Sequence, residues 1–134
     1  MNYWLVKSDP EEYSWDDLHR DRKTSWDGIR NYAARNHMRN MKKGDTVLVY
    51  HSGGESAIRG IATVSKATYA DPTAKEGDWS SVELKADKTL LHPVTLAAIK
   101  TDRRLKNMLL LKISRLSVMP VQQEEYEALM EMAG

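Results

Sequence analysis

Cysteine and phenylalanine are both missing from this sequence of 134 residues. Without cysteine the chain forms no disulfide and offers no thiolate ligand to a metal, which fits a reducing compartment. Bulky packing therefore falls to four Trp, six Tyr and seven Met. No stretch approaches the roughly 20 apolar residues that cross a bilayer, and the polar start predicts no signal peptide. Together these absences predict a cytoplasmic protein that does not associate with membranes.

Metal and nucleotide motifs are missing as well. The histidines lack the spacing of metal ligands, and neither a P-loop nor a dinucleotide fingerprint occurs. We therefore expect no metal and no cofactor. No repeat or low-complexity segment interrupts the chain, whose length suits one domain over residues 1–134.

Charge is nearly balanced overall, with 20 Lys and Arg against 19 Asp and Glu, but it is unevenly distributed. Residues 19–43 hold eight basic side chains and two acids, and residues 100–115 hold six basic side chains and one acid. Two such segments would form a polyanion site if folding brought them together. The alternative is that they are two solvated helix faces.

The stretch Ser25–Asn36 combines aromatic, basic and amide side chains in one short run. Asp27-Gly28 is typical of a turn, because glycine accepts a positive φ. A helix over residues 31–41 would then carry polar, basic and aromatic groups on one face: Tyr32, Arg35, Asn36 and Arg39. The turn and the helix would deliver Trp26, Arg30, Asn31 and Arg35 to a common rim.

Patterns along the rest of the chain predict an α+β fold. Strands are expected over residues 2–7, 46–51, 57–69, 79–91 (stopped by 92–94) and 110–118. Helices are expected from Ser14, Thr95 and Asp102 as caps and over 124–132, with 22–24 as a polar connector. Gly60 would mark a bend or a close backbone approach. About six strands with short helices suggest a curved or barrel-like mixed sheet with helices at its ends.

Two tryptophans, Trp26 and Trp79, lie in polar surroundings next to turns, unlike Trp4. Tryptophan in a small domain commonly belongs to the core. The alternative is that these two face each other and sandwich a planar group, since stacking on an aromatic side chain contributes about 1–3 kcal/mol per base.

Tyr50-His51-Ser52-Gly53 ends a buried strand and opens a glycine loop, a common place for functional side chains. A nucleophilic Ser52 with His51 as base is disfavoured, because neighbours on a strand point to opposite faces and no nucleophile elbow is present. Hydrogen bonding to a ligand and simple turn chemistry both stay open. Arg115, at the end of the last apolar run, is either a phosphate contact or a surface cation.

Several motifs in order resemble those of the EVE domain family over nearly the whole chain. They are Tyr3–Pro10, Trp26–Asn36, Lys42, Gly44-Asp45, Tyr50-His51-Ser52, Tyr69, Asp71-Pro72-Thr73, Arg115-Leu116-Ser117 and Pro120. The resemblance implies a PUA-like fold related to the YTH domains, which read methylated adenine in RNA. It implies a non-catalytic module that binds DNA or RNA carrying a modified base.

The same resemblance implies roles for individual residues. The base pocket would be lined by Lys7, Ser8, Trp26, Asn31, Tyr32, His51, Ser52 and Trp79. Arg30, Arg35 and Arg115 would hold phosphates. An extruded base costs a few kcal/mol of stacking, which aromatic walls partly restore, and cations supply salt-dependent affinity that is independent of sequence.

Two other functions remain open at this point. One is a nucleotide or RNA-processing enzyme that uses His51, Ser52 and an acid such as Asp71. The other is an interaction domain whose pocket binds a small ligand or a peptide. The sequence does not distinguish DNA from RNA, and it names no particular base or oligomeric state.

Overall fold

A mixed six-stranded sheet organises the molecule in the computed structural model, which describes residues 2–134. The expected α+β class with a curved sheet and short flanking helices is confirmed. The strands are β1 (Tyr3–Ser8), β2 (Lys23–Trp26), β3 (Thr46–His51), β4 (Ala57–Ala70), β5 (Ser80–Thr95) and β6 (Val118–Val121). They lie in the order β2-β5-β4-β3-β1-β6, with β1 and β3 parallel and the other pairs antiparallel.

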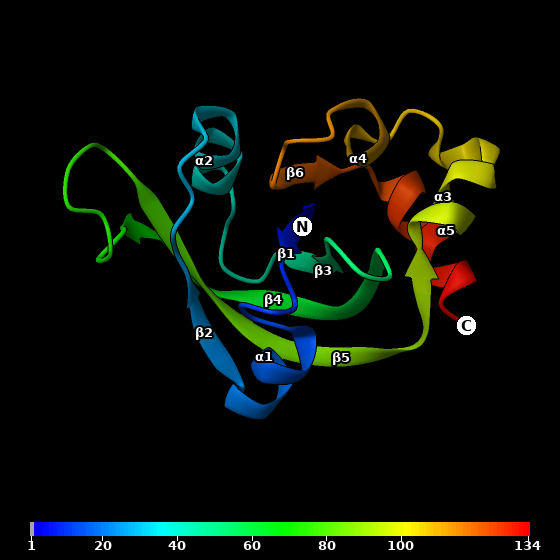
Figure 1. The fold of residues 1–134 in the computed structure, drawn as a ribbon, viewed down its shortest axis with the longest axis horizontal. Coiled ribbons are helices and arrows are strands. Elements are labelled where there is room, and N and C mark those ends of the chain that lie inside the picture. Colours follow the sequence, from blue (N-terminus) through cyan, green and yellow to red (C-terminus); the bar gives the residue numbers. More distant parts are fainter. Residues whose placement is uncertain (1) are drawn as a thin grey trace.

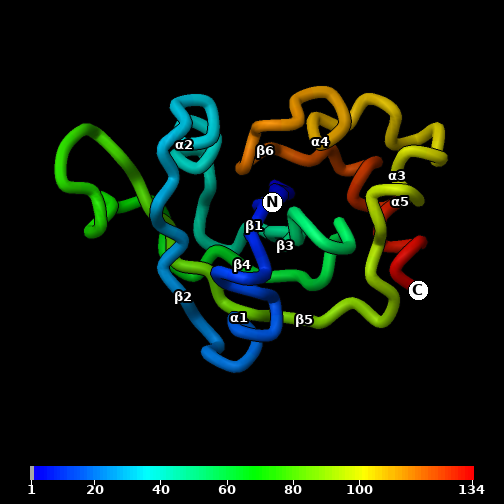
Figure 2. Tube along the Cα trace, in the orientation of Figure 1, coloured from blue at the N-terminus to red at the C-terminus, as the bar shows by residue number. Residues whose placement is uncertain are grey.

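Short helices surround this sheet. They are α1 (Trp15–Asp21), α2 (Tyr32–Arg39), α3 (Leu96–Thr101), a 3-10 turn η1 (Arg103–Leu105), α4 (Leu109–Lys112) and α5 (Gln123–Met132). Figure 1 shows α2 beside the projecting β4–β5 hairpin, and α3, α4 and α5 gathered at the opposite end near the C-terminus. In the tube view the β5 backbone runs between these two ends along one side of the molecule (Figure 2). None of the helices in residues 2–134 is long and apolar enough to cross a membrane.

Helices α1 and α3 begin at the capping residues expected from the sequence, Ser14 and Thr95, whereas the expected cap Asp102 begins only the short η1. The Ser14 hydroxyl accepts a hydrogen bond from Asp17 N, and the Asp17 carboxylate accepts one from Ser14 N in return. The Asn31 side chain caps α2, and the Thr95 hydroxyl caps α3. Each cap satisfies a backbone N–H that the first helical turn leaves without a partner.

The core lies around β1, whose Leu5 and Val6 are fully buried between β3 and β6. Trp4 is also buried, and its indole N–H donates to Asp45 Oδ2 at 2.9 Å. This tryptophan is therefore structural, as its position inside an apolar run suggested.

Gly60 lies directly against the side chain of Trp15. A Cβ at this position would lie 2.2 Å from Cε2 of Trp15, whose indole packs flat against the backbone and is 2% exposed. The expected close approach at Gly60 is confirmed. The indole N–H of Trp15 donates to the Thr89 hydroxyl at 2.9 Å, so α1 is fixed across β4 and β5.

Three expectations about elements were wrong. Residues 22–24 had been expected as a connector, but residues 23–26 form strand β2. They pair with the edge of β5 that β4 leaves open. The strand β5 continues through Pro93 to Thr95, since residues 90–93 bulge opposite Arg59 and the missing N–H of proline is tolerated there. Residues 110–118 do not form one strand: helix α4 takes the apolar run, and β6 begins at Val118.

Candidate functional site

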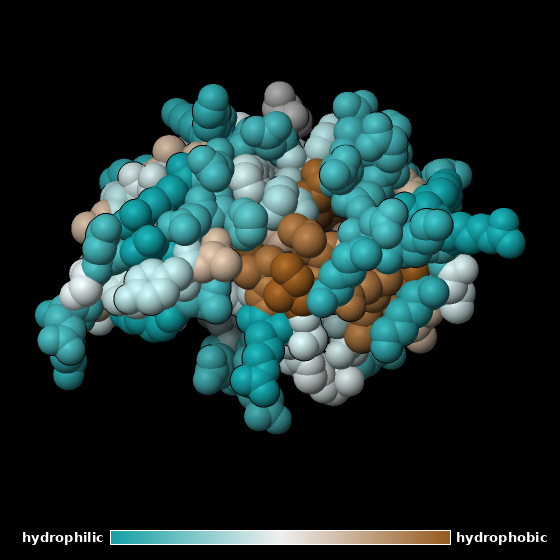
Figure 3. All heavy atoms as spheres, turned by 90° about the horizontal axis from the view of Figure 1, so that it is seen from above, coloured by the Kyte–Doolittle hydropathy of each residue, from teal (hydrophilic) through white to brown (hydrophobic). Residues whose placement is uncertain are grey.

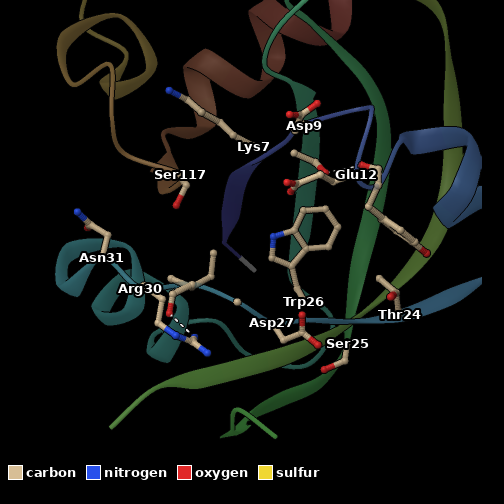
Figure 4. A pocket seen from close by; sticks show the side chains of 14 residues that line it. Lys7, Asp9, Glu12, Thr24, Ser25, Trp26, Asp27, Arg30, Asn31 and Ser117 are labelled. Carbon is tan, nitrogen blue, oxygen red and sulfur yellow. Dashed lines mark hydrogen bonds between the residues drawn. The ribbon is translucent and has the colours of Figure 1, made fainter. Parts of the chain in front are cut away.

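A cavity of about 540 Å³ opens where β1, β2 and the start of α2 meet. Residues from four segments line it: Lys7, Ser8, Asp9, Glu12, Tyr13, Thr24, Ser25, Trp26, Asp27, Gly28, Ile29, Arg30, Asn31 and Ser117. Figure 4 shows Trp26 in the middle of this set, with Asp9 and Glu12 on one side of its indole and Asp27 on the other. The volume falls within the roughly 300–1,000 Å³ of small-molecule sites.

The aromatic wall of the cavity consists of Trp26 and Tyr13. Trp26 is the last residue of β2 and is 7% exposed. The ring of Tyr13 meets its indole edge to face, with centroids 6.3 Å apart and planes at 79°. The hydroxyl of Tyr13 donates to Asp21 Oδ2 at 2.9 Å, which anchors the ring to α1. The wall is therefore rigid before any ligand arrives.

Residues 9–13 fold into a tight turn that carries two acids to the cavity. The carbonyl of Asp9 accepts hydrogen bonds from Glu12 N at 3.0 Å and Tyr13 N at 2.9 Å. The hydroxyl of Ser8 donates to the carbonyl of Tyr13 and closes the turn. The Ser8 hydroxyl, which lines the cavity, thus donates its proton within the turn, and toward a ligand its oxygen can only accept a hydrogen bond.

Charged groups of both signs face the cavity. The Lys7 ammonium donates to the carbonyl of Ser114 at 2.8 Å, and partial burial lowers the pKa of this lysine. Partial burial raises the pKa of the Asp27 carboxyl, and the nearby charge of Asp71 raises it further. The site thus offers carboxylate acceptors as well as cationic donors.

Two lining residues, Gly28 and Arg30, form what we call the floor of the cavity, and Asp71 holds them from behind with a side chain that is fully buried. One carboxylate oxygen accepts from Gly28 N and Arg30 Nη1, both at 2.9 Å. The other accepts from the backbone N and the hydroxyl of Thr73, both at 2.7 Å. Burial alone would raise the pKa of Asp71, but these hydrogen bonds outweigh it and hold the pKa well below its usual range. Asp71 is thus a fixed anion that ties the β4–β5 hairpin to the segment before α2.

An aromatic stack stands beside the cavity. The rings of Tyr32 and Trp79 are stacked, with centroids 5.0 Å apart and planes at 21°. The Arg35 guanidinium carbon lies 5.0 Å from the Tyr32 centroid and 5.7 Å from that of Trp79. Seen from above, the end of the molecule with α2 and the hairpin, on the left of Figure 3, presents mainly hydrophilic side chains, and apolar ones gather in the middle of the face. Neither ring of the stack belongs to the cavity wall.

His51 and Ser52 lie away from the cavity wall. His51 is buried, and its Nε2 accepts a hydrogen bond from Trp15 N at 2.9 Å. Burial lowers the pKa of His51, and the charge of Arg59 lowers it further. The backbone N of Ser52 donates to the Ser8 carbonyl at 2.9 Å, and its hydroxyl approaches the same oxygen at 3.4 Å. Both residues are thus engaged by the strand ends next to the site.

The cavity wall includes four of the expected pocket residues: Lys7, Ser8, Trp26 and Asn31. Tyr32, Trp79, His51 and Ser52 lie off it, because the first two stack on each other and the last two bond to neighbouring backbone. Arg30, expected at a phosphate, lines the wall. Arg115 is exposed on the loop after α4, two residues before Ser117 of the wall.

Sequence reasoning missed several wall residues, above all Tyr13, Glu12 and Asp27. Their signal in the sequence is weak: acids before a helix are equally typical of an N-terminal first turn. The turn closed by Ser8 is what brings Glu12 and Tyr13 back over β1. Within residues 2–134, no three His, Asp or Glu side chains group in a way that could hold a metal ion.

Comparison with known proteins gives consistent matches. The sequence model of the EVE domain matches residues 2–132. Human thymocyte nuclear protein 1 is 33% identical, over 98% of this chain and 73% of that protein. A Rhodopseudomonas palustris protein solved by NMR is 45% identical with a TM-score of 0.94, covering 100% of this chain and 94% of the other. The crystal structure of human THYN1 protein in complex with 5-methylcytosine containing DNA is 32% identical with a TM-score of 0.88, covering 99% of this chain and 98% of the other.

Proposed function

The chain belongs to the EVE domain family, and from that premise we propose that residues 1–134 act as one domain that binds nucleic acid and reads a modified base in the cavity. The observation that carries the proposal is a cavity with an aromatic wall, carboxylates and cations together, in a chain similar to a protein crystallised with 5-methylcytosine DNA. Modified DNA is accordingly the first partner to test. A cytoplasmic location stays a prediction.

The aromatic wall suits a flat base that has left its stack. Extrusion costs a few kcal/mol, and stacking on an aromatic side chain returns about 1–3 kcal/mol. The base would stack on the part of the Trp26 indole that reaches the cavity, with Ile29 as an apolar neighbour on the same wall. A methyl group placed against apolar atoms adds about 0.8 kcal/mol, which corresponds to about fourfold in affinity.

The polar groups suit a base with an exocyclic amino group. Cytosine presents its N4 amino group as a donor, for which carboxylates are the natural acceptors. Glu12 and Asp27 supply carboxylates on the wall. Asn31 uses its side-chain oxygen to cap α2 at Ala34 N, which leaves its NH₂ group to donate to a base oxygen.

Cations near the opening suit the phosphates on either side of that base. Arg30 lines the wall just before α2, and Arg35 lies on α2 about one helical turn after Tyr32. The first turn of α2 holds no acid, so the positive end of the helix dipole adds to their field. Arg115 would approach the backbone from the loop next to Ser117. These contacts would give affinity that falls as salt rises.

We propose a non-catalytic role. A hydrolase built on His51 and Ser52 would need the imidazole to accept the serine proton, but His51 Nε2 already accepts from Trp15 N. The acid considered with them, Asp71, is bound to Arg30 and Thr73 at the floor of the cavity. Each of the three is engaged in a separate structural contact.

The test is binding of short DNA strands that carry one 5-methylcytosine, cytosine or thymine, measured by fluorescence anisotropy at one fixed salt concentration. We expect the methylated strand to bind about fourfold tighter than the cytosine strand. Glu12→Gln and Asp27→Asn should each weaken binding of the methylated strand about fivefold or more, because a carboxylate acceptor is lost.

Glu11→Gln is the matched control, because Glu11 is exposed on the same turn and is not part of the cavity wall. Trp26→Ala should abolish binding, but its burial requires that the fold be checked by circular dichroism. Equal affinity of the wild type for all three strands would refute reading of the base. Turnover of a nucleotide substrate that survives in Trp26→Ala and is lost in His51→Ala would favour the enzyme instead.

A further inference from the structure

Tyr32 is an exposed aromatic side chain that lies outside the cavity wall. It is 66% exposed; among residues 2–134 the other exposed large hydrophobic side chains are Leu91 at 75% and Ile113 at 47%. One face of its ring is covered by Trp79. Because Trp79 covers one face and the residue is still largely exposed, the opposite face is the ring surface that a further group can contact.

The ring is held in place before any ligand binds. The Arg35 guanidinium lies 5.0 Å from its centroid, and Nη1 of that arginine donates to the Asp78 carbonyl at 3.0 Å. Arg39 Nη2 donates to Asp78 Oδ1 at 2.7 Å, so the hairpin end that carries Trp79 is fastened to α2. An exposed side chain fixed in this way loses little conformational entropy on binding.

Its position relative to the cavity is fixed by the chain. Tyr32 is the first residue of α2 and directly follows Arg30 and Asn31, which both line the wall. Tyr32 therefore lies at the edge of the cavity, within reach of a base that neighbours one held inside it. The Arg35 guanidinium lies next to Tyr32 and donates only to neutral oxygens, so its charge is available to the phosphate between the two bases.

We propose that the open face of Tyr32 stacks on the nucleobase next to the one held in the cavity. The inference rests on the proposed function and adds a second contact site outside the cavity, with the Tyr32–Trp79 pair as its platform. The occupant is a base of any identity, since every base offers a flat π-face. The site therefore contributes affinity for a strand without selecting the modification.

The test is a double-mutant cycle that combines substitution of Tyr32 with removal of the neighbouring base and measures DNA-binding affinity. Three single-stranded DNAs are compared, and each carries one 5-methylcytosine. The first is intact, the second has an abasic site on the 5′ side of the 5-methylcytosine, and the third has an abasic site on the 3′ side. For the wild type, one of the two abasic strands should bind about tenfold more weakly than the intact strand, which corresponds to ~1.4 kcal/mol and lies within the range for base–aromatic stacking.

For Tyr32→Ala all three strands should bind alike, and Tyr32→Leu should behave in the same way because volume is kept but the ring is lost. Tyr32→Phe should retain the wild-type ratio. Leu91→Ala is the control, since Leu91 is 75% exposed and lies on β5 outside the cavity wall.

Two results overturn the inference. One is a wild type that binds all three strands alike, and the other is a Tyr32→Ala or Tyr32→Leu protein that keeps the tenfold ratio. A Tyr32 that merely fastens α2 to the hairpin would lower affinity for all strands equally and preserve that ratio. Failure of the wild type to prefer the intact methylated strand over its unmethylated counterpart would instead refute the proposed function.

Discussion

Replacement of Asp71 by asparagine should loosen the floor of the cavity and lower the stability of the protein. The carboxylate is fully buried and accepts four hydrogen bonds, two on each oxygen. An amide of the same shape has only one acceptor oxygen. If that oxygen faces Arg30 and Gly28, the NH₂ group must point at the backbone N–H of Thr73, where the present contact is 2.7 Å.

The magnitude follows from these contacts. A buried backbone donor without a partner costs about 1–3 kcal/mol, and a hydrogen bond to a charged group contributes about 1.5–3 kcal/mol. The Arg30 side chain is 40% exposed, so water screens part of the lost ion pair. We therefore expect Asp71→Asn to lower the free energy of unfolding by about 3 kcal/mol at neutral pH, near the lower end for a broken buried pair.

The dependence on pH has a definite sign. The pKa of Asp71 is lowered in the folded protein, so its ionised form stabilises the fold at every pH above the unfolded value of about 3.9. That contribution is lost as the pH falls below about 3.9 toward the folded pKa. The difference between the wild type and Asp71→Asn should thus be constant from pH 7 to about pH 5 and shrink below about pH 4.

Urea unfolding followed by tryptophan fluorescence measures both quantities. Thr73→Ala is the matched comparison, because it removes one neutral donor to the same carboxylate and should cost only about 1 kcal/mol. A loss of less than ~0.5 kcal/mol in Asp71→Asn, or a difference that does not shrink in acid, would refute the view that Asp71 is a buried structural anion.

Three further predictions concern other contacts. Gly60→Ala should lower the free energy of unfolding by about 3 kcal/mol, because its Cβ would overlap the Trp15 indole at 2.2 Å; urea unfolding checks this, and a near-neutral result would contradict the packing. His51 has a lowered pKa when folded, so the wild type should lose stability as the pH falls below about 6.5. His51→Gln should remove that part of the pH dependence, and a stability profile that the substitution leaves unchanged would show that His51 is not its source. If the proposed function holds, Arg35→Gln should weaken binding to all DNA strands alike and reduce the slope of log affinity against log salt by about 1, as anisotropy titrations at several salt concentrations would measure; an unchanged slope would place Arg35 away from phosphate.

Local signals in the sequence predicted much of the fold. Ser14 and Thr95, both expected as caps, each cap a helix through their own side chains, so their effect depends on neighbours within three residues. The alternating or continuous apolar runs of β1, β3 and β4 likewise predicted strands close to their observed bounds. The apolar run after Met108 was ambiguous, because a short run of leucines has no period that separates a helix from a strand.

The candidate site was predicted in part for the same reason. Trp26, Arg30 and Asn31 are close in sequence, and the turn at Gly28, with φ of +77°, brings them to one wall. The expected facing pair of Trp26 and Trp79 was wrong: Trp26 meets Tyr13 on the cavity wall, whereas Trp79 stacks on Tyr32 beside the cavity. Tyr32 and Trp79 are nearly fifty residues apart in the sequence. No local pattern could therefore predict that these two rings stack on each other.

Local sequence was sufficient to predict the starts of α1 and α3, the strands β1, β3 and β4, and the aromatic, amide and basic groups before α2, because those features depend on residues near each other in the chain. Tertiary structure alone decided that Asp71 serves as a buried anchor, that Tyr13 becomes the second wall of the cavity, and that His51 turns its Nε2 toward Trp15. Each of these roles depends on a partner supplied by a different element, and only the packing of the sheet and helices brings those partners within hydrogen-bonding or van der Waals distance.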